Sequence, residues 1–475
     1  MTRRRIRRAG LWPAAWLALE LAGAAALAGT NDCDWGPFYR CDTDVFGSRR
    51  WQALGPLFEA RQAPDGRALT AVHPLYSAVR EPAARRRAAD VVWPLWMFRK
   101  VGDHRQFDVL LLGYYNDLDC TRRGGPYRAG LFPVYFQGRA RNGRPYVAVF
   151  PVGGVLRDFL FWNEARFILF PLWSVSRINE AETRSWLWPV VSRTRGGGHD
   201  RFRVFPIYGV TRFRLDVENK FILWPIWTSV RRQGPGGGSG FMLFPFVGHA
   251  AMAGQESWMI VPPLTRFTRS DRLREVNCPW PLFQWSAGDI DRLYFWPVWG
   301  RKSMEGVDSR FVLWPLYRER READADRRRH TVRLIPLLAC SSERAAPQAS
   351  GGGELLERRL KVWPLFSTHR WPGGFRLQAL SLSPFLDYEP VERNWARLWT
   401  LYTRASSPAG TEEEWLWGLV RRRRMADGCG RLSVFPLLEI ERRPDGGSWS
   451  LFKGLLGAKR AGVRRTFRVG YALEW

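Results

Sequence analysis

The residue types that could carry out chemistry are present in this chain, but they are not grouped. The six histidines lie in different parts of the sequence, without the spacing of a metal site. The carboxylates Glu412 to Glu414 are interpreted as a solvated acidic loop. Glycine runs such as Gly196 to Gly198 lack the Gly-Lys-Ser step of a phosphate-binding loop. We therefore expect a protein that is not an enzyme, with no catalytic residue, no metal and no cofactor.

A short apolar run centred on proline recurs along nearly the whole chain. Phe-Ile-Leu-Trp-Pro-Ile-Trp at 221–227 is one example. From Pro56 to Pro384, successive prolines or their stand-ins are mostly 16 to 21 residues apart, with one step of 28. The repeat continues more weakly as far as Gly454. A period of this length indicates one small unit stacked many times, so we expect a single long array.

The composition of the repeat predicts β-structure. Its runs are rich in aromatic and β-branched residues, which suit strands, and turn formers such as Asn142-Gly143 lie between them. Proline at the centre of a run excludes a helix. We therefore expect an all-β antiparallel meander of about 22–24 strands, bent by a bulge at each proline and closed into a large β-barrel. The alternative is that each run forms two short strands hinged at proline, as in a solenoid coil.

Tryptophan precedes the proline in many runs, for example at Trp224 and Trp314. Placed at mid-strand, these side chains would stack as a ladder in the core. The functional alternative is an aromatic track that contacts sugar rings or acyl chains. His73 occupies the position that tryptophan or phenylalanine takes elsewhere, and it is interpreted as a packing substitution and not as a ligand.

The start of the chain has the features of an export signal. Arginines precede an apolar stretch at 11–27, and Ala26-Leu27-Ala28 is a small-residue cleavage site. We therefore expect a signal peptide at 1–28, an N-terminal segment at 29–50 and a single β-repeat domain at 51–475.

Two cysteines follow this leader closely. In an oxidising periplasm Cys33 and Cys41 could form a disulfide. The alternative is lipidation of Cys33, which would anchor the protein to a membrane surface.

The net charge is +28, from 73 lysines and arginines against 45 aspartates and glutamates. A charge of this sign favours anionic partners. The arginines are spread over nearly every turn, whereas a nucleic-acid reader concentrates them on one face or module. We therefore expect membrane lipid or lipopolysaccharide as a partner and no nucleic acid.

The last residues alternate in polarity. Residues 468–475, Arg-Val-Gly-Tyr-Ala-Leu-Glu-Trp, resemble the terminal β-signal by which bacterial outer-membrane barrels are recognised for assembly. The resemblance implies that Gly470, Tyr471, Leu473 and Trp475 are assembly-signal residues, that the barrel-assembly machinery is a partner, and that the protein lies in the outer membrane. Unlike porin strands, however, the apolar runs are apolar on both faces.

The repeat as a whole resembles a group of uncharacterised bacterial envelope proteins with many Phe/Trp-Pro-Leu-aromatic units. The resemblance lies in Leu54-Gly55-Pro56-Leu57-Phe58, His73-Pro74-Leu75-Tyr76 and Trp93-Pro94-Leu95-Trp96. It implies the architecture but no activity. We therefore predict a non-enzymatic outer-membrane β-barrel of the cell envelope with a structural role or a role in the passage of lipids or apolar solutes. The alternative is a soluble periplasmic or surface β-repeat scaffold that binds anionic glycan or lipid through its basic turns.

Overall fold

The computed structural model describes residues 32–214, 216–346, 353–384, 389–462, 464–471 and 473–474. The predicted signal peptide at 1–28 lies outside the described residues. The described chain is an all-β antiparallel meander of 46 strands with a few short helical segments. None of the helices in this part of the chain is long and apolar enough to cross a membrane.

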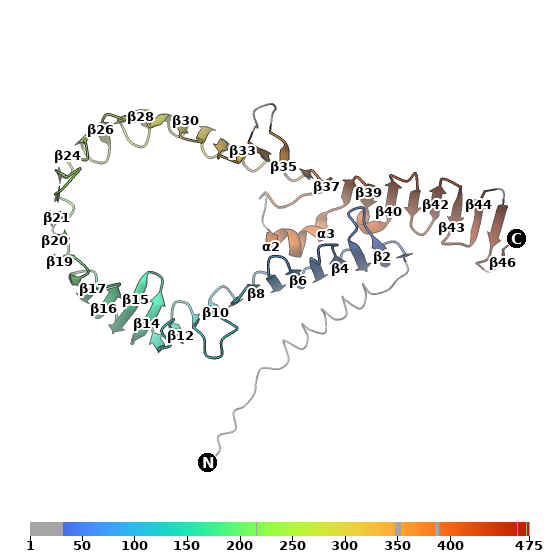
Figure 1. The fold of residues 1–475 in the computed structure, drawn as a ribbon, viewed down its shortest axis with the longest axis horizontal. Helices are drawn as coiled ribbons and strands as arrows, with labels where there is room; N and C mark the ends of the chain where they lie inside the picture. Colours follow the sequence, from blue (N-terminus) through green and yellow to red (C-terminus); the bar gives the residue numbers. More distant parts are fainter. Residues whose placement is uncertain are drawn as a thin grey trace, which may run out of the picture. The chain divides into compact units, whose positions relative to one another are not determined.

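The chain divides into two compact units, where the sequence predicts a single domain. The first unit contains the residues up to Gly102 and those from Ala325 onward, and the second contains Asp103–Asp324. Strands begin at Cys33, within the predicted N-terminal segment at 29–50, and pair in the same meander as the strands that follow. Figure 1 shows the strands in chain order.

The first unit consists of two series of strands and four helical segments. The N-terminal series contains β1 (Cys33–Asp34), β2 (Tyr39–Thr43), β3 (Arg49–Ala53), β4 (Phe58–Gln62), β5 (Ala68–Val72), β6 (Tyr76–Glu81), β7 (Arg86–Val91) and β8 (Trp96–Val101). The C-terminal series contains β33 (Arg327–Leu334), β34 (Leu338–Ala345), β35 (Leu355–Val362), β36 (Phe366–Trp371), β37 (Gly374–Ala379), β38 (Tyr402–Ser407), β39 (Gly410–Trp415), β40 (Val420–Met425), β41 (Gly430–Val434), β42 (Leu438–Arg443), β43 (Gly446–Leu451), β44 (Leu456–Ala461), β45 (Arg464–Val469) and β46 (Leu473–Glu474). The helical segments are α2 (Glu389–Val391), η1 (Glu392–Ala396), α3 (Arg397–Trp399) and η2 (Leu416–Gly418).

The second unit is one continuous series of strands. It contains β9 (His104–Val109), β10 (Gly113–Asp117), β11 (Tyr127–Leu131), β12 (Tyr135–Arg139), β13 (Pro145–Val149), β14 (Gly153–Phe159), β15 (Trp162–Ile168), β16 (Trp173–Ile178), β17 (Ala181–Trp186), β18 (Val191–Gly196), β19 (His199–Val204), β20 (Tyr208–Phe213), β21 (Val217–Ile222), β22 (Trp227–Arg232), β23 (Gly238–Leu243), β24 (Val247–Met252), β25 (Gln255–Ile260), β26 (Thr265–Arg269), β27 (Leu273–Asn277), β28 (Phe283–Gly288), β29 (Ile290–Phe295), β30 (Trp299–Met304), β31 (Val307–Val312) and β32 (Tyr317–Ala323). A small apolar cluster lies on β12 to β15, where Phe136, Tyr146 and Phe167 are buried together.

From Pro56 to Pro364, the proline-centred runs form tight turns between two short strands and not the middle of one strand. In the run at 221–227, β21 ends at Ile222 and β22 begins at Trp227. The peptide bond between Trp224 and Pro225 in this turn is cis. The predicted bulge at a mid-strand proline is therefore wrong. Proline has no N–H to donate to a strand ladder, and the turn places it where the ladder does not need one.

The strand number follows from this placement. Each run contributes the end of one strand and the start of the next, so the described chain has 46 strands where about 22–24 are predicted. The alternative, two short strands on either side of proline, is what the run at 221–227 forms. These two strands pair as an antiparallel hairpin, however, and do not start a solenoid coil. Within each unit the strand pairings among described residues join sequence neighbours and close neither sheet, so the closed barrel stays a prediction.

In the first unit β2 and β3 lie against β39 and β40, and the helical segment α2–η1–α3 is packed against the N-terminal series (Figure 1). Asn394 in η1 is almost fully buried. Its amide oxygen accepts a hydrogen bond from Ser77 Oγ at 2.6 Å, and its amide nitrogen donates to Asp90 Oδ2 at 2.9 Å. The backbone carbonyl of the same residue lies 3.1 Å from His73 Nδ1. His73 is thus a buried polar contact of the helical segment, which the interpretation as an aromatic packing substitute does not anticipate.

Candidate functional site

The facing strands of the first unit meet through charged side chains. Asp42 on β2 is buried, and its carboxylate accepts hydrogen bonds from Arg50 Nε at 3.2 Å and Arg423 Nη2 at 3.0 Å. It also pairs with Arg421 on β40 and lies 3.6 Å from Arg40 Nε. The Asp42 carboxylate therefore interacts with four guanidinium groups, which come from both series of strands.

The predicted acidic loop at Glu412 to Glu414 is part of the same contact. Glu412 and Glu414 are only 4% and 5% exposed, so the interpretation as a solvated turn is wrong for both. Arg50 Nη2 donates to Glu412 Oε1 at 2.6 Å, and Arg40 Nη2 donates to Glu414 Oε2 at 3.1 Å. Alternate residues of a strand share a face, so Glu412 and Glu414 both point from β39 toward the N-terminal strands while Glu413 does not.

These pairs form a network that we call the buried charge network. Among the described residues it joins five arginines and five carboxylates: Arg40, Arg50, Arg397, Arg421 and Arg423, with Asp34, Asp42, Glu59, Glu412 and Glu414. The ion pair of Arg61 and Asp44 is separate from it. Buried ions of one sign are costly unless the other sign is present in matching number. The network meets that condition within itself.

The network shifts the pKa values of its members. Burial alone would raise the pKa of Glu414, but the positive charges of Arg40, Arg397 and Arg50 outweigh burial and lower that pKa to about 2. The pKa of Asp42 is also lowered, because Arg50 and Arg421 outweigh its burial. Burial, together with repulsion from Arg421 and Arg50, lowers the pKa of Arg40 to about 10.

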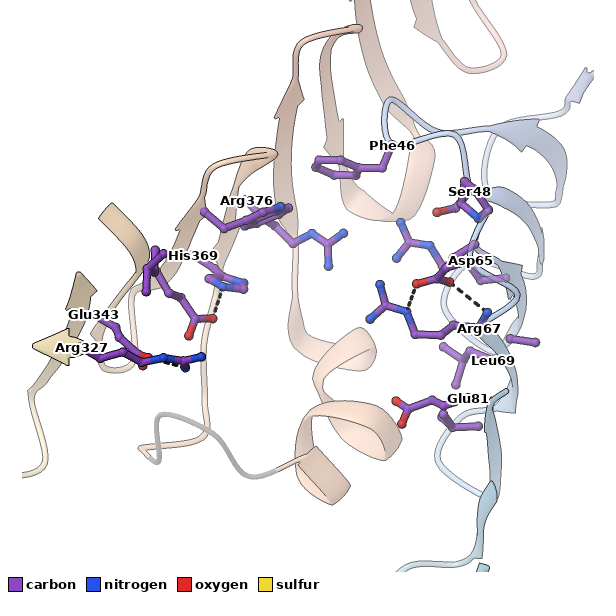
Figure 2. Close-up of a pocket in the computed structure, with 18 residues that line it drawn as sticks. Phe46, Ser48, Asp65, Arg67, Leu69, Glu81, Arg327, Glu343, His369 and Arg376 are labelled. Atoms are coloured by element: carbon purple, nitrogen blue, oxygen red, sulfur yellow. Dashed lines mark hydrogen bonds and ion pairs between the residues drawn. The ribbon is translucent and has the colours of Figure 1, made fainter. Parts of the chain in front are cut away.

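A cleft of about 1000 Å³ lies beside this network, between the two series of strands of the first unit (Figure 2). Figure 2 shows Arg376 and His369 on one wall and Arg67 and Glu81 on the other. Phe46 and the guanidinium of Arg376 are in cation–π contact at 5.6 Å. The cleft thus combines charged walls with an aromatic patch.

The described residues contain no group of three or more His, Cys, Asp or Glu side chains that could hold a metal ion. In the second unit, the exposed ends of the proline-centred turns form another candidate site, which we call the apolar turn edge. Trp224 and Trp188 are each 50% exposed. The tryptophans that precede proline are therefore not a core ladder, because they lie in turns beyond the ends of the strands.

The turns of this edge are joined to one another in register. The backbone N–H of Trp188 donates to the carbonyl of Pro171, and that of Trp224 donates to the carbonyl of Pro206, each at 2.7 Å. Aromatic rings of successive turns touch as a result, with centroids 5.5 Å apart for Phe170 and Trp188. The apolar turn edge is therefore an ordered row of exposed rings. The opposite edge consists mostly of polar turns, such as Gly196 to Gly198.

The predicted disulfide residues are brought together. Cys33 on β1 and Cys41 on β2 are register partners in the antiparallel pair. Direct partners in such a pair have Cα atoms about 4.5–5.5 Å apart, within the range that a disulfide spans. We expect that peptide mass spectrometry of the oxidised, unreduced protein will find the two peptides joined. Alkylation of both thiols before reduction would contradict this prediction.

The predicted assembly-signal residues do not form one continuous strand. β45 ends at Val469, and β46 contains Leu473 and Glu474, with Val469 and Leu473 as register partners. Gly470 and Tyr471 lie in the turn between them and have positive φ angles. Trp475 lies outside the described residues. The assembly role of these residues stays a prediction.

No protein-family model matches this chain, and no curated protein matches it. The functional conclusion therefore depends on the fold and on its side chains. Sequence reasoning missed the buried charge network. The charge runs at Glu412–Glu414 and Arg421–Arg424 are unbroken, so they do not show which alternate residues are covered. The one signal is at Arg40 and Asp42, which flank the uncharged Cys41 and therefore share one face of a strand.

Proposed function

We propose that this protein is a non-enzymatic protein of the cell envelope that attaches to a lipid membrane by its apolar turn edge. The observation that carries the proposal is the row of exposed aromatic turns. A soluble monomer rarely exposes a contiguous apolar patch of more than a few hundred Å² without a partner for it. Tryptophan in particular favours the interface between the hydrocarbon core and the headgroups.

The length of the strands favours contact through the edge over strands that span the bilayer. A membrane-spanning strand needs about 9–11 residues, whereas β21 and β22 have six residues each. At about 3.3 Å per residue such a strand is on the order of 20 Å long. Its other end carries charged residues, such as the Glu218 and Arg212 ion pair. The polarity therefore changes along each strand, which suits insertion of one edge.

Basic residues lie close to the apolar turn edge. Arg301 and Arg310 are exposed register partners on β30 and β31. They lie two residues from Trp299 and Val312, which pair at the turn end of the same strands. Two positive charges beside an apolar rim suit anionic headgroups, which attract arginine and lysine near the membrane surface. Membrane lipid or lipopolysaccharide is therefore the partner that we propose.

The outer membrane is the location that we propose, supported by the leader at 1–28 and by the resemblance at 468–475. The barrel-assembly machinery is proposed as a partner because of the resemblance at 468–475 alone. Fractionation of cells that express the full chain tests the location. We expect the protein in the outer-membrane fraction, and recovery in the soluble periplasm would contradict it.

Removing rings from the apolar turn edge is expected to weaken vesicle binding. We predict that the triple variant Trp188→Ser, Trp224→Ser and Trp314→Ser lowers the partition coefficient about tenfold or more, because each buried aromatic ring contributes about 1.5–3 kcal/mol. Cosedimentation with vesicles of phosphatidylcholine, with and without phosphatidylglycerol, measures the effect.

The matched control is the double variant Leu160→Ser and Phe161→Ser. Both residues are exposed in a turn at the opposite edge, with Phe161 69% exposed. We expect the control to bind vesicles within about twofold of the parent protein. The proposal fails if the parent stays in the supernatant with both kinds of vesicle, and the soluble scaffold would then be favoured. It also fails if the triple variant binds as the parent does.

A further inference from the structure

The cleft of the first unit contains an arginine that the buried charge network leaves without a carboxylate. Arg376 on β37 is partly buried, and the structure gives its guanidinium no hydrogen bond or ion pair to any described residue. Its one described contact is the ring of Phe46, 5.6 Å from the guanidinium carbon. The five arginines and five carboxylates of the network balance. Arg376 adds one more positive charge, and the carboxylate that stabilises this charge, Asp44, is already paired with Arg61.

The position of Arg376 places that charge at the centre of the hollow space. Three adjoining hollows, of about 1000, 600 and 100 Å³, are each lined by both Arg376 and Arg61. Arg61 pairs with Asp44, and that carboxylate also accepts the backbone N–H groups of Phe46 and Ser48. The Asp44 carboxylate therefore acts on both guanidinium groups but pairs directly with Arg61 alone. The carboxylates that line the cleft itself are Asp65, Glu81, Glu343 and Glu357.

The electrostatics agree with this geometry. Burial and the positive charge of Arg61 outweigh the opposing attraction of Asp44 and lower the pKa of Arg376 to about 10. A guanidinium whose charged form is disfavoured gains more than an already paired one when an anion from solution reaches it.

The walls of the cleft show what kind of anion fits. The ring of Phe46 lies 5.5 Å from that of Trp371, so an aromatic patch adjoins the unpaired guanidinium. A volume near 1000 Å³ is at the upper end of the range for small-molecule sites. Planar guanidinium groups bind phosphate through two parallel hydrogen bonds.

We propose that Arg376 and Arg61 form the anion-binding part of a ligand site that takes a small molecule bearing a phosphate group. The phosphate lies against the Arg376 guanidinium and replaces its missing carboxylate. The organic part of the ligand lies along Phe46 and Trp371. This site is separate from the apolar turn edge and does not depend on membrane attachment.

Calorimetric titration of the full-length protein tests the proposal, with inorganic pyrophosphate and glucose 1-phosphate as probes and glucose as the uncharged control. We expect saturable binding of at least one phosphate compound at about 0.15 M salt, where exposed charges are largely screened. If glucose 1-phosphate binds more tightly than pyrophosphate, the ligand is an organic phosphate. If pyrophosphate binds equally or more tightly, the ligand is a free phosphate anion. The absence of saturable binding for both would overturn the proposal.

Variants separate this site from attraction to a basic protein in general. Arg376→Gln is expected to weaken binding about tenfold or more, and Arg376→Lys about three- to tenfold, because lysine keeps the charge but loses the paired hydrogen bonds. The control is Arg318→Gln, which removes an equal charge from an exposed position on β32.

The variant Arg376→Gln should fold at least as well as the parent, because it removes a charge that burial disfavours and that has no direct ion pair. We expect its melting temperature to be equal or higher, and we expect added phosphate compound to raise the melting temperature of the parent but not of this variant. Unchanged binding in Arg376→Gln, or an equal loss in Arg318→Gln, would refute the site.

Discussion

Replacing Asp42 with asparagine is expected to destabilise the first unit by about 3–5 kcal/mol, the cost of breaking a buried ion pair from one side. The carboxylate faces Arg40, Arg50, Arg421 and Arg423. Its loss leaves the four guanidinium groups with three carboxylates, those of Asp34, Glu412 and Glu414. Unfolding in urea measures the change, because an ionic denaturant would screen the pairs.

Hydrogen exchange should locate the effect. We expect amide protection in Asp42→Asn to fall in β2 to β4 and in β39 and β40, which carry most of the buried charge network. The matched control is Asp65→Asn, which breaks an exposed pair with Arg67 at 2.6 Å. Exposed pairs contribute about 0–1 kcal/mol, so this control should remain close to the parent. An Asp42→Asn variant as stable as the control would show that the network does not hold the two series of strands together.

Acidification is expected to weaken the buried charge network between the two series of strands. The pKa of Glu414 is lowered to about 2, and those of Asp42 and Glu412 are lowered as well, by arginines that outweigh their burial. In an unfolded chain such groups titrate near pH 4. Between about pH 2 and pH 4 the unfolded state therefore binds more protons than the folded state. The free energy of unfolding falls as the pH falls for this reason.

The loss should begin near pH 5 and continue toward pH 2, with a total on the order of several kcal/mol, since a tenfold difference in acidity between the folded and unfolded states corresponds to about 1.4 kcal/mol. Urea unfolding at pH 7, 5, 4 and 3 measures it. The variant Glu414→Gln should be less stable at pH 7 but should lose less on acidification, because one titrating group is gone. A free energy of unfolding that stays constant or rises from pH 5 to pH 3 would contradict the prediction.

The expectations that hold are those that depend on neighbours in the sequence. The period of the repeat, the aromatic and β-branched runs and the Asn-Gly turns predict an antiparallel all-β meander, and the structure confirms it. The predicted place of proline at mid-strand is wrong. Both a bulged strand and a turn accommodate a proline such as Pro225, and the pattern of residue types is the same for both. The hydrogen bonds between successive turns, as between Trp224 and Pro206, become visible only when the strands are in place.

The sequence also does not show which charged residues are buried. A glutamate on a turn-rich chain is usually solvated, and Glu413 remains outside the buried charge network, whereas its neighbours Glu412 and Glu414 are buried. The difference depends on which face of β39 is covered. That cover comes from strands at the other end of the chain.

By itself the sequence determined the all-β fold class, because strand propensity, turn chemistry and a short repeat period are properties of adjacent residues. Only the tertiary structure decided that Arg40 meets Glu414, 374 positions away, and that Arg376 is left without a carboxylate. The physical reason is that the energy of a buried charge depends on the charge that faces it, and residue spacing along the chain does not record which strands face each other.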